Sequence, residues 1–117
     1  MPQLLFPFDA PRNIQNELIS DVQNAIQNKR HLIAHAPTGL GKTAATLGPA
    51  LTAALEKGYS VFFLTPKHAQ HQIAIETLQK IKQRHKINFT VADLIGKKWM
   101  CSIQGVDKLS SKEFNDF

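Results

Sequence analysis

Apolar residues three or four positions apart predict three amphipathic helices along the chain. We expect Asp9 to cap the first helix, with Pro11 in its first turn. The second helix should cover residues 43–57 and end at Gly58, and the third follows His71. The residues of the first helix expected to face the core are Ile14, Leu18, Val22, Ala25 and Ile26.

Three short runs between and after these helices are mostly apolar: residues 31–36, 60–65 and 88–95. Continuous apolar runs of this length are typical of parallel strands that are covered on both faces. The predicted fold class is therefore α/β, a parallel sheet of three strands with flanking helices and a right-handed crossover. Three strands make a small sheet with a hydrophobic edge, which favours the front portion of a larger protein.

Composition excludes several classes of protein. The chain has 117 residues, enough for one modest domain, and 43% of them are hydrophobic, which is ordinary for a soluble protein. No stretch approaches the roughly 18 apolar residues of a membrane helix, and the first residues lack the basic region of a signal peptide. One cysteine allows no internal disulfide. We therefore expect a cytoplasmic, intracellular protein.

Positive charge is concentrated in one part of the chain. Residues 57–98 contain eight basic residues and two acidic ones, whereas the whole chain has a net charge of +5. A local surplus of positive charge is typical of a surface that binds nucleic acid, although a solvated helix face would give the same pattern.

One eight-residue segment carries a clear chemical signature. It matches the phosphate-binding pattern G-x-x-x-x-G-K-[ST], with alanine in place of the first glycine. The glycines allow backbone N–H groups to turn toward phosphate oxygens, Lys42 reaches the β- and γ-phosphates, and the Thr43 hydroxyl ligates Mg²⁺. The segment predicts a site for ATP and Mg²⁺, with Lys42 and Thr43 as catalytic residues. Its members are Ala36, Pro37, Thr38, Gly39, Leu40, Gly41, Lys42 and Thr43.

Two further segments carry candidate binding residues. Arg12 and Gln15 lie at the start of the first helix, where polar side chains suit the adenine edge and Phe6 or Phe8 offers a stacking face. A second polar group follows residues 60–65, at a strand end where ligands bind in open α/β sheets. Its proposed contacts to the phosphates of single-stranded DNA are Thr65, Lys67, His68 and His71. A metal site at the two histidines would need a third ligand that the sequence does not offer.

Two residues near the end of the chain have alternative interpretations. Asp93 follows an apolar run, as the Mg²⁺-binding aspartate of nucleotidases does, but Leu94 stands where a helicase carries glutamate. Cys101, considered by itself, is a free thiol, since a cubane cluster needs four thiolates.

The stretch from Phe8 to Cys101 resembles the N-terminal part of the first motor domain of XPD-like iron–sulphur DNA helicases of superfamily two, most closely archaeal members. The resemblance rests on Pro11-Arg12 with Gln15, on the loop from Ala36 to Thr43, on residues 65–71 and on the segment 93–101. Alanine at the first loop position and Thr38-Gly39 are typical of helicases. In the family, a cysteine after Gly-[Lys/Arg]-Lys-x-x is the first of four ligands to a [4Fe–4S] cluster.

The resemblance implies a P-loop NTPase (RecA-like) fold and a 5′→3′ ATP-dependent DNA helicase acting in DNA repair. Residues 1–98 would be the nucleotide-binding part of motor domain 1, and residues 99–117 the truncated start of the iron–sulphur domain. Arg12 and Gln15 would recognise adenine, residues 65–71 would contact single-stranded DNA, and Cys101 would ligate iron. The Asp-Glu-Ala-His box, the arginine finger and the second motor domain are missing, so the chain alone should hydrolyse no ATP.

Two other classes fit the residues. One is a different P-loop nucleotidase, such as a small kinase, in which the basic segment has no function. The other is a non-catalytic module that binds nucleotide or DNA. ATP hydrolysis that DNA stimulates would distinguish the helicase from both. The oligomeric state and the preferred DNA substrate do not follow from the sequence.

Overall fold

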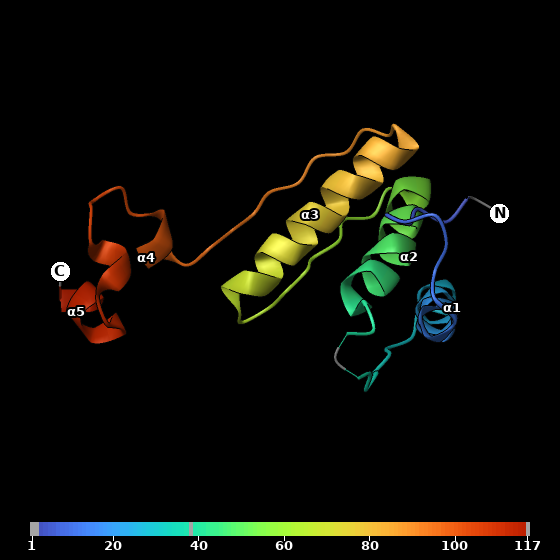
Figure 1. Ribbon diagram of the computed structural model, residues 1–117, viewed down its shortest axis with the longest axis horizontal. Coiled ribbons are helices and arrows are strands. Elements are labelled where there is room, and N and C mark those ends of the chain that lie inside the picture. The colour runs from blue at the N-terminus through green and yellow to red at the C-terminus, as the bar shows by residue number, and fades with distance from the viewer. Residues whose placement is uncertain (1–2, 38, 117) are drawn as a thin grey trace.

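The computed structural model describes residues 3–37 and 39–116. Helices dominate this part of the chain (Figure 1). In chain order, they are α1 (Asn13–Gln27), α2 (Lys42–Lys57), α3 (His68–His85), α4 (Lys97–Met100), the 3-10 turn η1 (Val106–Lys108) and α5 (Ser111–Asp116). None of the helices within the described ranges is long and apolar enough to cross a membrane.

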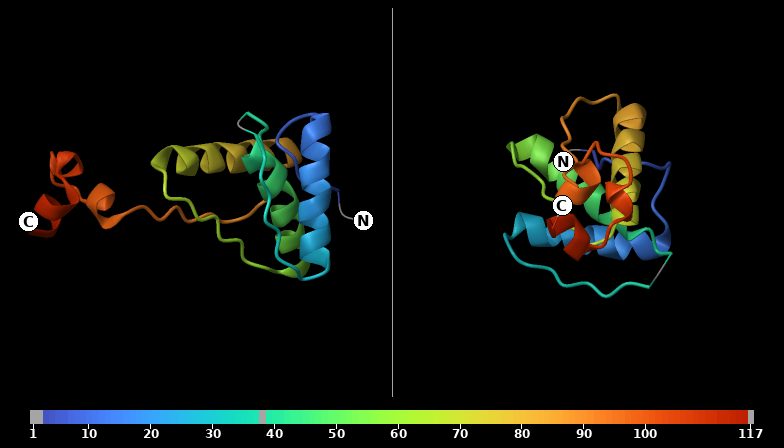
Figure 2. Two further views of the ribbon diagram at one scale, coloured as in Figure 1. Left: turned by 90° about the horizontal axis from the view of Figure 1, so that it is seen from below. Right: turned by 90° about the vertical axis from the view of Figure 1, so that its left-hand side faces the viewer.

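The core lies where α1 packs along α2, and α3 packs on another side of α2 (Figures 1 and 2). Small side chains on α2 allow this close approach, since Ala45 is completely buried between its neighbours. The third helix contributes Ala74 and the fully buried Ile81. The buried cluster between α1, α2 and the N-terminal segment consists of Phe6, Leu18, Ile19, Leu40, Ala44 and Ala45.

The N-terminal segment before Arg12 does not form the first turn of α1. It lies against α3 instead. The N-cap of α1 is Arg12, so the prediction that Asp9 caps this helix is wrong. Asp9 instead pairs with Arg84 of α3 at 2.8 Å, and His85 Nε2 lies 3.1 Å from the Phe6 nitrogen and 2.9 Å from its carbonyl oxygen. These contacts hold the segment against the C-terminal end of α3.

The predicted core face of α1 is only partly correct. Leu18 is buried, and Val22, Ala25 and Ile26 are half-buried, but Ile14 is 62% exposed. Ile19 is buried in its place. The buried face of α1 consists of Gln15, Leu18 and Ile19, and Ile14 lies outside this face.

The fold class predicted from the apolar runs, a RecA-like parallel sheet, is contradicted. No strand forms within the described residues, and the runs 31–36, 60–65 and 88–95 are extended segments that join no backbone ladder there. A strand is stabilised by a paired neighbour and by cover on its faces; within the described residues these runs have no paired neighbour and only partial cover. Several of their apolar side chains are therefore largely exposed: Ile33 is 99%, Phe62 84% and Leu94 80% exposed.

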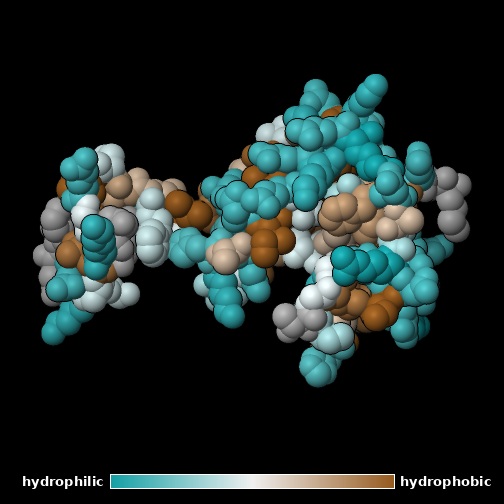
Figure 3. All heavy atoms as spheres, in the orientation of Figure 1, coloured by the Kyte–Doolittle hydropathy of each residue, from teal (hydrophilic) through white to brown (hydrophobic). Residues whose placement is uncertain are grey.

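Two of these runs, 60–65 and 88–95, border an open apolar hollow of about 970 Å³ with α2 and α3. Leu47 and Leu51 of α2 and Ile75 and Leu78 of α3 form part of its lining. Hydrophobic surface is visible between polar side chains on the face shown in Figure 3. The α2 side chains that line it, Leu47 and Leu51, are buried, whereas Phe62 and Leu64 of the extended segment in its lining are exposed.

Candidate functional site

The candidate nucleotide site is the loop that connects the extended segment 31–36 to α2. Gly39 and Gly41 adopt left-handed backbone conformations, with φ of +84° and +78°. Between them, the side chain of Leu40 is buried in the core cluster and anchors the loop to the helices. Gly41 is the N-cap of α2, so the loop ends where the helix begins. Thr38 lies outside the described residues.

Lys42 is the first residue of α2, and its side chain turns back over the loop. Its ammonium group donates a hydrogen bond of 3.0 Å to the carbonyl oxygen of Ala36, the first residue of the phosphate-binding pattern. The side chain is exposed, so the charge remains accessible to a ligand. Thr43 follows on the same helical turn and is half-buried. The two predicted catalytic residues therefore lie together at the N-terminal end of α2.

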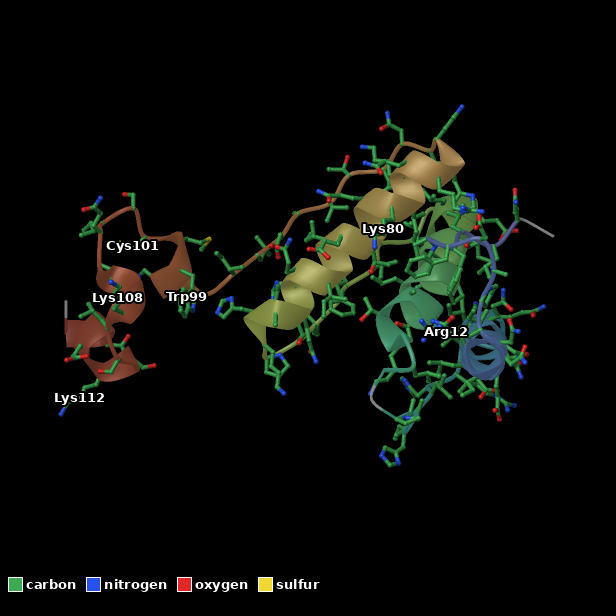
Figure 4. All side chains as sticks on the ribbon, in the orientation of Figure 1. Arg12, Lys80, Trp99, Cys101, Lys108 and Lys112 are labelled. Atoms are coloured by element: carbon green, nitrogen blue, oxygen red, sulfur yellow. The ribbon has the colours of Figure 1, made fainter. Side chains whose placement is uncertain are left out.

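Arg12 and Gln15, from the start of α1, both bind the backbone of this loop (Figure 4 labels Arg12). Arg12 Nη1 donates to the carbonyl of Gly39 at 3.4 Å, and Gln15 Nε2 donates to the carbonyl of Gly41 at 3.3 Å. The other end of the Gln15 amide accepts a hydrogen bond of 2.9 Å from the Arg12 backbone N–H. Gln15 is only 4% exposed. Side chains at the start of α1 thus bind two backbone carbonyls of the loop.

Gly41 is needed at its position for two reasons. Its positive φ disfavours any residue with a side chain. A Cβ there would also lie 2.3 Å from Gln15 Nε2, whereas a Cβ at Gly39 would meet nothing within 4 Å. The sequence pattern indicated the first reason, but the close approach of Gln15 became visible only in the structure.

The aromatic candidates for adenine stacking differ in access. Phe6 is 4% exposed and belongs to the core cluster, which leaves no free face for a base. Phe8 is 50% exposed, lies edge-on to Phe6 at 5.9 Å between ring centroids, and has Lys80 Nζ 5.3 Å from its own centroid. Recognition of adenine by Arg12 and Gln15 remains a prediction, since the contacts described above are made to the loop.

The segment proposed to contact DNA forms the turn that starts α3. Thr65 Oγ1 accepts a hydrogen bond of 3.3 Å from the Lys67 N–H and also bonds the side-chain oxygen of Gln70. Lys67 is the N-cap of α3 and is exposed, as is His68. The turn therefore presents a basic side chain and an imidazole on the surface.

His71, the fourth predicted DNA contact, has an acidic partner. Its Nδ1 lies 2.8 Å from a carboxylate oxygen of Asp93. Asp93 was considered above as a Mg²⁺ ligand, and the structure places it beside this histidine in the extended run 88–95. Sequence reasoning missed the pair because the two residues belong to different elements, and no spacing rule links them.

Cys101 follows α4 directly and is half-buried. It is the only cysteine of the chain, and in residues 3–37 and 39–116 no group of three or more His, Cys, Asp or Glu side chains could hold a metal. A [4Fe–4S] cluster needs four thiolates, so these residues alone do not fit one.

A glycine-containing loop that opens a helix with Gly-Lys-Thr is typical of proteins that bind nucleoside triphosphates. The family comparison is more specific: the chain belongs to the DEAD/DEAH box helicase family, whose model matches residues 12–112.

Two curated relatives agree with this assignment. The chain is 39% identical over 101 residues to a probable ATP-dependent helicase, MJ0942, of Methanocaldococcus jannaschii, a match that covers 86% of this chain and 15% of the relative. It is 35% identical over 101 residues to the ATP-dependent DNA helicase YoaA of Haemophilus influenzae, covering 85% of this chain and 15% of the relative. The chain thus spans about 15% of the length of these relatives. No solved structure matches it closely enough to count as a relative.

Proposed function

We propose that this chain is the ATP-binding, N-terminal portion of the first motor domain of an ATP-dependent DNA helicase. The observation that carries the proposal is the grip of Arg12 and Gln15 on the loop that contains Lys42. Hydrogen bonds to the carbonyls of Gly39 and Gly41 fix the loop backbone at two points. A loop whose backbone is held in this way supports the binding of phosphate at the start of α2, because less of it has to be ordered when the ligand binds.

In the proposed site, the ammonium of Lys42, the hydroxyl of Thr43 and the backbone N–H groups each bind a different part of MgATP. The Lys42 ammonium gives up its hydrogen bond to the Ala36 carbonyl and binds the β- and γ-phosphate oxygens instead. The attraction between opposite charges favours this change of partner. The hydroxyl of Thr43 would be one ligand of Mg²⁺, which neutralises charge on the phosphates when bound. The backbone N–H groups at the start of α2 complete the cradle. Hydrolysis needs in addition an acidic pair and an arginine, and we expect none from this chain alone.

DNA is the proposed partner because one of the matched relatives is named as a DNA helicase and because basic residues gather in residues 57–98. Lys67 and His68 are exposed at the start of α3, which suits contacts to phosphate that read no sequence. Thr65 and His71 belong to the same proposed surface, with His71 already paired to Asp93.

We further propose that the helicase is of the XPD-like, iron–sulphur type, with 5′→3′ polarity and a role in DNA repair. The segment from Gly96 to Cys101 supports this, because the family has a cysteine at the same distance from a Gly-basic-Lys sequence. On this proposal, residues 1–98 belong to motor domain 1 and residues 99–117 begin the cluster domain. Cys101 would be one ligand, and three further thiolates would come from residues outside this chain.

The test is ATP hydrolysis by the longer protein that carries this segment, measured with and without single-stranded DNA. We expect DNA to stimulate hydrolysis and Lys42→Ala to abolish it. Duplexes with a 5′ or a 3′ overhang then report polarity, and the 5′ overhang should be opened. Hydrolysis that DNA leaves unchanged would contradict the helicase, while opening from a 3′ overhang alone would contradict the XPD-like type.

A further inference from the structure

An aromatic pair outside the nucleotide site joins two elements that are distant in the sequence. The rings of His68, the first residue of α3, and Trp99, on α4, are 4.6 Å apart between centroids with an interplanar angle of 64°. Figure 4 labels Trp99 on α4, which lies beyond the end of α3 where His68 is found. The contact is edge-to-face, a favourable geometry for two rings.

The indole is held in place by its own turn as well as by His68. The Trp99 backbone N–H donates a hydrogen bond of 2.8 Å to the carbonyl of Gly96. A Cβ on Gly96 would lie 3.4 Å from Cδ1 of the indole, so the glycine allows the ring to lie close against the backbone. The orientation of the indole is thus set from two sides.

A large part of this pair stays accessible. Trp99 is 46% exposed and His68 is exposed. By solvent exposure, nearly half of the Trp99 side chain is accessible. Pre-positioned, half-exposed aromatic side chains are the feature on which proteins stack the bases of single-stranded nucleic acid.

The charges around the pair favour an anionic ligand. Lys67 directly precedes His68, and Lys97 lies on the same short helix as Trp99; both side chains are exposed. The acidic side chain near this end of α3, Asp93, is in contact with His71, whose ring centroid is 6.0 Å from that of His68. An aromatic platform with flanking lysines matches a base together with its phosphates.

We propose that Trp99, supported by His68, is a stacking site for a base of single-stranded nucleic acid. The inference deepens the proposed function and rests on it, because it adds direct contact with a base to a surface otherwise assigned to phosphate contacts. Bases in a duplex have both faces covered by their neighbours, so the site selects unpaired strands.

Trp99 is the only tryptophan of the chain, so its fluorescence reports on the site directly. The experiment titrates this chain with oligothymidylate and with an abasic oligonucleotide of equal length and charge, and follows indole emission and the anisotropy of a labelled strand. We expect oligothymidylate to quench the emission and to bind more tightly. The abasic strand should bind through its phosphates with little quenching.

Variants separate stacking from a structural role. Trp99→Ala should weaken oligothymidylate binding about 5- to 100-fold and leave the abasic strand unaffected, whereas Trp99→Phe should restore most of the affinity. His68→Ala should give an intermediate loss. Tyr59→Ala removes another aromatic side chain, 55% exposed, and is the matched control. Far-ultraviolet circular dichroism shows whether each variant keeps its helices.

Three results would overturn the inference. Equal affinity for the two strands, or an unchanged affinity in Trp99→Ala, would contradict the stacking site while leaving phosphate binding, and so the proposed function, in place. Failure of the chain to bind either strand would contradict both. Restored binding in Trp99→Phe with lost binding in Trp99→Ala is the pattern that an aromatic contact requires.

Discussion

Replacing Gly41 by alanine tests whether Gln15 shapes the phosphate-binding loop. The left-handed conformation of Gly41, with φ of +78°, costs an L-residue about 1–2 kcal/mol. The new Cβ would also lie 2.3 Å from Gln15 Nε2, so this amide must leave the Gly41 carbonyl. A buried amide without its partner costs about 1–3 kcal/mol more. The expected total loss in the free energy of unfolding is about 2–5 kcal/mol.

Gly39→Ala is the matched control, because its φ is +84° and nothing lies within 4 Å of its Cβ position. It should lose only the conformational term, about 1–2 kcal/mol. Urea unfolding of both variants, followed by circular dichroism, gives the difference directly. In a Gln15→Ala background, the extra cost of Gly41→Ala should disappear, as expected for two residues in contact. If the two glycine variants lose the same free energy, the reasoning about Gln15 is refuted.

The other predictions concern the core, the nucleic-acid surface and the metal-binding hydroxyl. Ile81→Ala should lower the free energy of unfolding by about 2–5 kcal/mol, since Ile81 is fully buried, whereas Ile14→Ala at a 62% exposed position should change it by less than about 0.5 kcal/mol; urea unfolding measures both. Lys67→Ala should flatten the dependence of log K on log[salt] for single-stranded DNA by about 0.7, and an unchanged slope would make Lys67 merely solvated. Thr43→Ala should weaken binding of ATP in the presence of Mg²⁺ more than in its absence, and equal losses in calorimetric titrations would remove the hydroxyl from the metal site.

Local signals predicted the three long helices, but the third begins at His68 and not after His71 as expected. The second helix was expected over residues 43–57 and is observed at Lys42–Lys57, ending at Gly58 with φ of +71°. On α3, helical spacing predicts Ala74, Ile75, Leu78 and Ile81 on one side; Ala74 and Ile81 are buried, and Ile75 and Leu78 are half-buried. These features depend on neighbours along the chain, which a periodic pattern records.

Features that depend on distant residues were missed. The sheet was predicted wrongly because apolar runs indicate strands only where partners pair with them, and the described residues supply no ladder. Asp9 was assigned to a helix cap, but Arg84 from the far end of α3 binds it. The hydrogen bond from Gln15 to the Gly41 carbonyl and the contact between His68 and Trp99 likewise arise from packing.

The central claim is that the loop before α2 binds the phosphates of ATP through Lys42. Calorimetric titration of this chain with MgATP, comparing Lys42→Ala with Lys57→Ala, tests it most directly. Both variants lose one positive charge from the same helix, at its first and last residue. The account predicts that Lys42→Ala weakens MgATP binding at least about tenfold and that Lys57→Ala binds like the unmodified chain. Equal affinity in the two variants would contradict it.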